Sequence, residues 1–136
     1  MRIIGIDYGD ARVGVAVSDA LGITAQGVGT IKNKGTENLL LELKKIIDSY
    51  SPQKIVIGLP KNMDGSLGFR ADATYRFAEA LKSVFMGEIV FWDERLTTVG
   101  ASRYLNETNT FKKARKNVID TLSACLILEG YMQKNS

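Results

Sequence analysis

Acidic residues at three distant points of the sequence occupy positions from which their carboxylates could meet at one edge of a sheet. Asp7 ends an Ile-rich predicted strand, the neighbours Asp93 and Glu94 follow another predicted strand, and Asp120 lies in a predicted C-terminal helix. Carboxylate oxygens suit Mg²⁺, which keeps part of its water shell in proteins. Two such ions, roughly 3.5–4 Å apart, can activate a water and stabilise the leaving oxygen at a phosphodiester. The pattern therefore predicts hydrolysis assisted by two Mg²⁺ or Mn²⁺ ions.

Each acid also has a simpler explanation. Asp7 could close the following turn through its side chain, and Asp120 would suit the positive end of a helix dipole if it lay in the first turn. Asp93 and Glu94 could merely terminate a strand; because neighbouring strand residues point to opposite faces, only one of them is expected to reach the site. The residues alone leave that choice open. The metal site is favoured because the three positions occur together.

The elements that must position these acids are predicted from hydrophobic periodicity. Residues 2–7 and 12–18 form a hairpin, since Val13, Val15 and Val17 alternate with small residues and the connection is short. A weaker third strand covers 23–31. The remaining predicted elements are a helix over 36–50 capped by Thr36, buried strands over 54–60 and 88–92, and helices over 69–85, from 97 or 98 to 107, and over 118–132.

This order predicts an α/β fold with one five-stranded mixed sheet, in which three antiparallel strands precede parallel βα units and helices cover both faces. Residues 1–136 are expected to form a single domain. In the last helix, an apolar stripe is predicted, and Asp120 is expected on a separate line with Ala124 and Ile127. The stripe consists of Val118, Ile119, Leu122, Cys125 and Leu126.

Composition excludes several kinds of chemistry. The chain has no histidine and a single cysteine, Cys125 in an apolar setting, so histidine-based triads, histidine-ligated zinc and an intrachain disulfide are ruled out. No apolar run approaches the roughly 18 residues that span a membrane, and a cytosolic location is expected. The net charge of +3 is too small to identify a polyanionic partner by itself.

The distribution of cations is more informative than their sum. Arg12 could contact a phosphate beside Asp7 or be an ordinary surface cation, and Arg95 could orient Glu94, bind phosphate or form a structural ion pair. Arg70 could reach the same face from the next helix. A run predicted as a basic loop precedes the helix with Asp120, and it suits either phosphate binding or a solvated surface. Its cations are Lys112, Lys113, Arg115 and Lys116.

Four segments, in order and over nearly the whole chain, resemble one bacterial family. They are Gly5-Ile6-Asp7-Tyr8-Gly9 with Arg12-Val13-Gly14-Val15-Ala16-Val17-Ser18-Asp19, Gly58-Leu59-Pro60 with Asn62-Met63-Asp64-Gly65, Asp93-Glu94-Arg95-Leu96-Thr97-Thr98, and Ile119-Asp120 with the helix of Ala124. The sequence thus resembles the YqgF family of Holliday-junction-resolvase-like nucleases of pre-16S rRNA.

This resemblance implies an RNase H-like fold and an acidic metal site formed by Asp7, Glu94 and Asp120. It also implies cytoplasmic trimming of the 5′ end of the 16S rRNA precursor, a step of ribosome biogenesis, or cleavage of four-way DNA junctions. For a junction substrate, a symmetric dimer would be expected; the sequence itself is compatible with a monomer or a homodimer.

Two other classes remain open from the sequence. The Asp-x-Gly and Gly-x-Ala pattern at Asp7 and Gly14 also resembles the phosphate loop of actin-like ATPases and sugar kinases, although those proteins enclose the nucleotide between two such domains. A non-catalytic RNA-binding module would use the basic run but would give the three acids no purpose.

Overall fold

The structure, a computed structural model, describes residues 1–96 and 113–135, with side chains from residue 119 onward in the last helix. Its elements follow the predicted order. They are β1 (Ile3–Asp7), β2 (Arg12–Ser18), β3 (Ala25–Lys32), α1 (Thr36–Tyr50), β4 (Lys54–Leu59), α2 (Phe69–Leu81), β5 (Glu88–Asp93), the short 3₁₀ helix η1 (Glu94–Leu96) and α4 (Lys113–Lys134). The helix expected up to residue 107 lies outside the described residues.

One mixed sheet with the order β3-β2-β1-β4-β5 organises the chain. β1 pairs antiparallel with β2, with Asp7 opposite Gly14. On its other side β1 pairs parallel with β4, with Ile6 beside Ile57, and β4 pairs parallel with β5. The antiparallel strands followed by parallel βα units are therefore confirmed, and the parallel strands β1, β4 and β5 end at one common edge.

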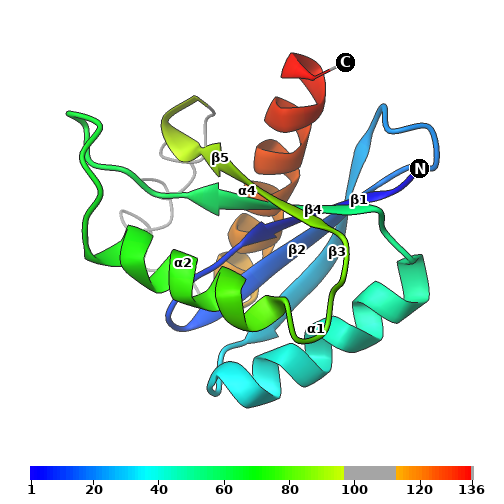
Figure 1. Cartoon of the computed structure of the whole chain (residues 1–136), viewed down its shortest axis with the longest axis horizontal. Coiled ribbons are helices and arrows are strands. Elements are labelled where there is room, and N and C mark those ends of the chain that lie inside the picture. The colour runs from blue at the N-terminus through cyan, green and yellow to red at the C-terminus, as the bar shows by residue number, and fades with distance from the viewer. Residues whose placement is uncertain (97–112, 136) are drawn as a thin grey trace.

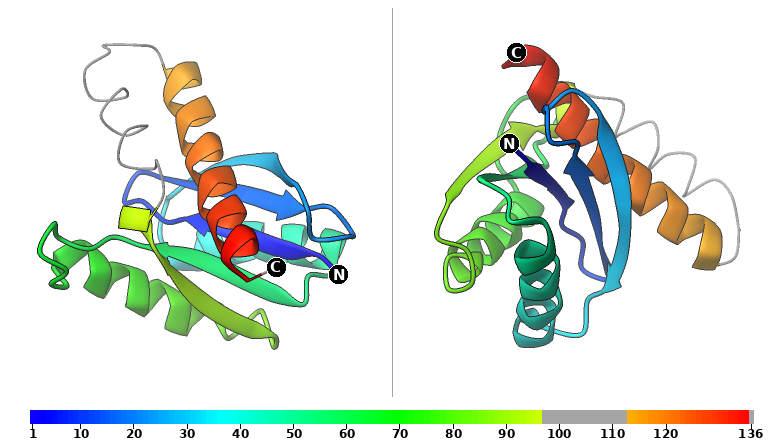
Figure 2. Two further views of the ribbon diagram at one scale, coloured as in Figure 1. Left: turned by 90° about the horizontal axis from the view of Figure 1, so that it is seen from above. Right: turned by 90° about the vertical axis from the view of Figure 1, so that its right-hand side faces the viewer.

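Helices cover both faces of this sheet, as predicted (Figure 1). α1 and α2 lie side by side on one face, and α4 crosses the other (Figure 2). Two apolar clusters fill the two interfaces. One joins α1 and α2 to the sheet through side chains such as Leu39, Phe77 and Ile6; the other joins α4 to the sheet through Trp92, Ile127 and Leu128.

The stripe of α4 that is most buried against the sheet is shifted from the one predicted, although Cys125 and Leu126 of the predicted stripe still pack against this apolar cluster. Its buried side chains are Ser123, Ala124, Ile127, Leu128 and Met132, whereas Leu122, a member of the predicted stripe, is 48% exposed. The predicted stripe contains more large hydrophobic side chains. The helix nevertheless buries a line that includes the small residues Ser123 and Ala124, because it comes very close to glycines of the sheet. The line that Asp120 shares with Ala124 and Ile127 is therefore the one that faces the sheet.

Glycines in the strands make this close approach possible. A Cβ at Gly5 would lie 2.8 Å from Leu128 Cβ, and one at Gly14 would lie 2.1 Å from the backbone oxygen of Asp120. Real Cβ atoms do not approach other atoms so closely. The face of β1 at Gly5 is therefore occupied by α4.

Three local predictions are wrong. Thr36 is the first helical residue of α1, and Gly35 is its N-cap, without a side-chain cap. β5 is an edge strand, with Phe91 38% exposed, and so it is not a buried strand. α4 begins at Lys113, so the basic run from Lys113 onward belongs to the backbone of a helix and not to a loop.

None of the helices in the described part of the chain combines the length and the apolar character that crossing a membrane requires.

Candidate active site

Asp7 lies at the centre of the candidate site, between two glycines. On one side its strand partner is Gly14 of β2. On the other side Gly58 of β4 comes one residue after Ile57, the partner of Ile6. Asp7 shares the parity of Gly5, so its side chain is on the sheet face that α4 covers. It is only 4% exposed, which is unusual for a carboxylate that serves only a surface turn.

Each of the other two acids lies over one of these glycines. The backbone oxygen of Asp120 rests on Gly14, and a Cβ at Gly58 would lie 3.1 Å from Oε2 of Glu94. Glu94 is 7% exposed. Asp7, Glu94 and Asp120 therefore come to the same face and the same edge of the sheet, from β1, η1 and α4. Sequence reasoning missed the role of these glycines; their signal was that Asp7 has a glycine on either side of it in the sheet register.

The residues at this edge suit a hard divalent cation. All three candidate ligands are carboxylates, and Gly58 leaves beside Glu94 a space that any Cβ would fill. As the side chains stand, however, no three Asp, Glu, His or Cys residues within the described ranges form a group ready to hold a metal ion. The side chain of Asp120 is instead engaged by an arginine.

Arg12 at the start of β2 is that arginine. Its Nε donates a hydrogen bond to Oδ2 of Asp120 at 2.6 Å, and the two side chains are 29% and 18% exposed. Asp120 lies seven residues after the start of α4, about two turns into the helix. It is therefore too far from the helix N-terminus for the macrodipole to explain its position, because that effect falls off within the first turn.

Asp93 and Glu94 have separate surroundings. Whereas Glu94 packs against Gly58, Asp93 binds Arg95. Nη2 of Arg95 donates to Oδ2 of Asp93 at 2.7 Å, and Nε donates to both carboxylate oxygens at 3.1 Å. Lys61 approaches Asp93 at 3.8 Å. These contacts make a structural ion pair the simplest role for Arg95, and of the two neighbouring acids it is Glu94 that lies against Gly58.

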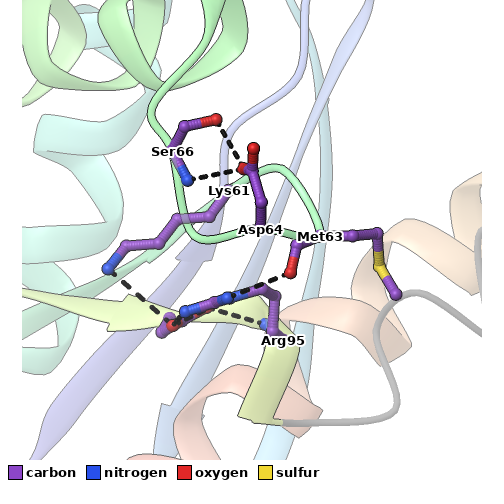
Figure 3. A network of polar contacts seen from close by, with 6 residues as sticks. Lys61, Met63, Asp64, Ser66 and Arg95 are labelled. Atoms are coloured by element: carbon purple, nitrogen blue, oxygen red, sulfur yellow. Dashed lines mark hydrogen bonds and ion pairs between the residues drawn. The ribbon is translucent and has the colours of Figure 1, made fainter.

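Arg95 also joins this ion pair to the loop that follows β4 (Figure 3). Its Nη1 donates to the backbone oxygen of Met63 at 3.5 Å and lies 3.4 Å from where a Cβ of Gly65 would be. Within the loop, Asp64 accepts hydrogen bonds from the backbone and hydroxyl of Ser66. Gly65 has φ +88, which favours glycine. Arg95 therefore holds this turn beside the candidate site.

The hydrogen bonds from Arg95 lower the pKa of Asp93, although burial acts in the opposite direction. Ionised Asp93 therefore stabilises the fold above its unfolded pKa of about 3.9, and this contribution is lost as the pH falls through the lower folded value. We expect Arg95→Ala to lower the urea midpoint at pH 7, and the difference from the wild type to shrink steadily below about pH 4.

The measurement is urea unfolding at several pH values between neutral and acidic, with the exposed Arg76 replaced by Ala as the matched control. A difference between wild type and Arg95→Ala that persisted unchanged in acid would show that charge on Asp93 is not its origin.

The remaining predicted cations are only partly described. Arg70 lies exposed in the first turn of α2, in the helix layer opposite α4, and so it is not gathered with the three acids. Lys113, Arg115 and Lys116 belong to the first turn of α4. Lys112 lies outside the described residues. The thiol of Cys125 is half-buried, and burial raises its pKa, which keeps it in the unreactive protonated form.

Comparison with known proteins gives a family and a fold. Residues 1–134 match RuvX, described as Holliday junction resolvase. A relative from Halothermothrix orenii, named "Putative pre-16S rRNA nuclease", is 50% identical over 132 residues, which cover 97% of this chain and 94% of that protein. A relative of the same name from Clostridium kluyveri is 46% identical over 136 residues, which cover 100% of this chain and 99% of that protein.

Among solved structures, T. thermophilus RuvC in complex with a Holliday junction substrate aligns with a TM-score of 0.61 at 12% identity, over 100% of this chain and 97% of that one. The likeness confirms the RNase H-like fold. Because the family match spans almost the whole sequence and full-length relatives are about half identical, the chain is a member of the RuvX family.

Proposed function

We propose that this protein is a metal-dependent nuclease that hydrolyses phosphodiester bonds, and that its substrate is the 5′ region of pre-16S rRNA. The observation that supports the proposal is that Asp7 and Glu94 are buried at one edge of the sheet, where α4 also brings the backbone of Asp120 against Gly14. Carboxylate oxygens are the ligands that hard divalent ions such as Mg²⁺ prefer in proteins, and such ions assist hydrolysis of phosphodiesters.

In this proposal Asp7, Glu94 and Asp120 hold two Mg²⁺ or Mn²⁺ ions, which when bound supply an activated water and stabilise the leaving 3′ oxygen. Asp7 is the central ligand, since it lies between Gly14 and Gly58. The chain has no histidine to accept a proton. Its acids therefore hold the ions in place, and proton transfer falls to the bound metal, to a phosphate, or to a lysine and water.

Cations near the acids are proposed to bind the phosphates that flank the scissile bond. Arg12 is the strongest of these, because it already touches Asp120. The cations before and within the start of α4 serve the same purpose: Lys112, Lys113, Arg115 and Lys116. The sequence suggested phosphate binding for Arg95 and Arg70 as well. The ion pair of Arg95 with Asp93 favours a structural role for Arg95. Arg70 lies in α2, in the helix layer opposite α4, which favours a peripheral role.

The substrate assignment rests on the names of the relatives, which mention pre-16S rRNA, and it implies action in the cytoplasm. The family description favours a second candidate, resolution of four-way DNA junctions. The protein acts as a monomer or a homodimer, and a measurement of its mass in solution distinguishes the two. A symmetric dimer would suit the paired strands of a four-way junction.

The test compares Mn²⁺-dependent cleavage of pre-16S rRNA, a four-way DNA junction and linear duplex DNA by the wild type and by Asp7→Asn. Asp10→Asn is the matched control, since Asp10 is an exposed acid in the turn after β1.

We expect the wild type and Asp10→Asn to cut the precursor, and Asp7→Asn to be inactive. Equal cutting by Asp7→Asn would remove the proposed chemistry, and preference for the junction would select the second candidate. Tight ATP binding without cleavage would favour a nucleotide-binding role.

A further inference from the structure

Arg12 and Asp120 form an ion pair between the start of β2 and the middle of α4, across 108 positions of sequence. In the described residues it is the one ion pair that either side chain makes. At 2.6 Å it is a short, charge-assisted hydrogen bond, and it is partly shielded from water. A proposed metal ligand is thus held by a cation that the chain itself provides.

The backbone beneath this pair keeps the two residues in register. Gly14, two residues after Arg12 on β2, lies against the backbone oxygen of Asp120. The next helical residue, Thr121, shares a hydroxyl hydrogen bond of 2.8 Å with Thr30 on β3. Arg12 and Asp120 are therefore brought together by the docking of α4, and little conformational freedom is lost when their side chains meet.

A divalent ion and the guanidinium of Arg12 compete for the same carboxylate. An oxygen that accepts a hydrogen bond from Nε is not free to coordinate a metal ion in the same direction, and two cations at one carboxylate repel each other. A guanidinium released from Asp120 presents a planar fork of N–H donors, which fits a phosphate with two parallel hydrogen bonds. The side chain that leaves Asp120 is thus suited to the substrate.

We propose that Arg12 is a displaceable counter-cation of Asp120: it holds the carboxylate in the absence of divalent ions and transfers to a substrate phosphate when they bind. The inference rests on the proposed function and adds a regulation to it. Because Arg12 leaves Asp120 more readily when a phosphate can receive it, substrate and divalent ions strengthen each other's binding. The free protein then binds ions weakly and is loaded fully only on nucleic acid.

The test is titration of the free protein with Mn²⁺, followed by the electron paramagnetic resonance of unbound Mn²⁺. Arg12→Gln removes the charge, Arg12→Lys keeps it, and Arg76→Gln removes an exposed arginine from α2 as the matched control. We expect Arg12→Gln to bind Mn²⁺ at least about tenfold more tightly than the wild type, as the loss of a competing charge-assisted hydrogen bond implies. Arg12→Lys and Arg76→Gln should stay close to the wild type.

Cleavage provides a second readout. With Arg12→Gln, half-maximal cleavage should need less Mn²⁺, while the maximal rate falls by about 10- to 100-fold because the phosphate loses its partner. Suppose that the wild type binds Mn²⁺ and cleaves, but that Arg12→Gln binds Mn²⁺ no more tightly than the wild type. This result would overturn the transfer of Arg12 from Asp120 to a phosphate and leave the proposed function intact. A wild type that neither binds Mn²⁺ nor cleaves would instead overturn the proposed function.

Discussion

Glu94→Gln should reduce Mn²⁺-dependent cleavage by about 10²–10³-fold, the loss typical of removing one preorganised electrostatic group from an active site. The substitution preserves the size and shape of the side chain, which packs against Gly58. It removes the negative charge from a position that is 7% exposed. The free energy of unfolding of the variant is measured beside its cleavage, so that a loss of activity can be separated from a loss of folded protein. A variant that is stable and inactive would identify the charge of Glu94 as functional.

The neighbouring acid is the sharpest control. Asp93→Asn makes the same chemical change one residue away, but Asp93 binds Arg95 and Lys61 instead of facing Gly58. We expect Asp93→Asn to be less stable at neutral pH and to retain most of its cleavage activity. The measurements are initial rates at saturating Mn²⁺ and urea midpoints for both variants. Full activity of Glu94→Gln, or equal inactivity of both variants, would contradict the assignment.

This pair also marks the limit of what the sequence can predict about the site. Alternation along β5 indicates that Asp93 and Glu94 point to opposite faces, but not which face each takes. The choice is made by η1, the 3₁₀ helix that starts at Glu94, and by the attraction between Asp93 and Arg95. The position of Asp7 was predictable because it ends a short apolar strand, at the edge where the carboxyl ends of parallel strands meet.

The sheet was predictable because its signal is local. Val13, Val15 and Val17 alternate with other residues along β2. The turn before this strand is too short for the crossover that parallel strands need, so the two strands must pair antiparallel. The docking of α4 was not predictable in the same way. Its hydrophobic stripe suggested one face, whereas the helix turns Ala124 and Ile127 to the sheet because glycines there admit a close approach. Periodicity counts hydrophobic residues and does not detect this fit between facing surfaces.

The pairing of Arg12 with Asp120 follows from that docking and was equally hidden. From sequence, phosphate contact and a surface position were both open for Arg12. The contact exists because α4 crosses β2 at Gly14, which is a property of two surfaces 108 positions apart in the chain. The one sequence signal of this crossing is Gly14, a residue without a side chain that lies opposite the buried Asp7 in the strand register.

Gly14→Ala tests that crossing directly and should be the most damaging of the small substitutions. Its Cβ would lie 2.1 Å from the backbone oxygen of Asp120 and 2.6 Å from the carbonyl carbon. Backbone atoms of a helix cannot swing aside as a side chain can, so α4 must lift from the sheet. We expect a loss of about 3 kcal/mol in the free energy of unfolding, at the upper end of overpacking effects.

Cleavage by Gly14→Ala should fall further than this instability explains. Displacement of a catalytic group by about 1 Å can cost about 10²-fold in rate, and Asp120 would move together with its helix. Gly68→Ala is the matched control, because a Cβ there meets nothing closer than 3.4 Å. Urea unfolding and cleavage at a temperature where both variants are folded provide the comparison. If Gly14→Ala cleaved as well as Gly68→Ala while folded, the position of Asp120 over β2 would not matter for the reaction, and its place among the metal ligands would have to be given up.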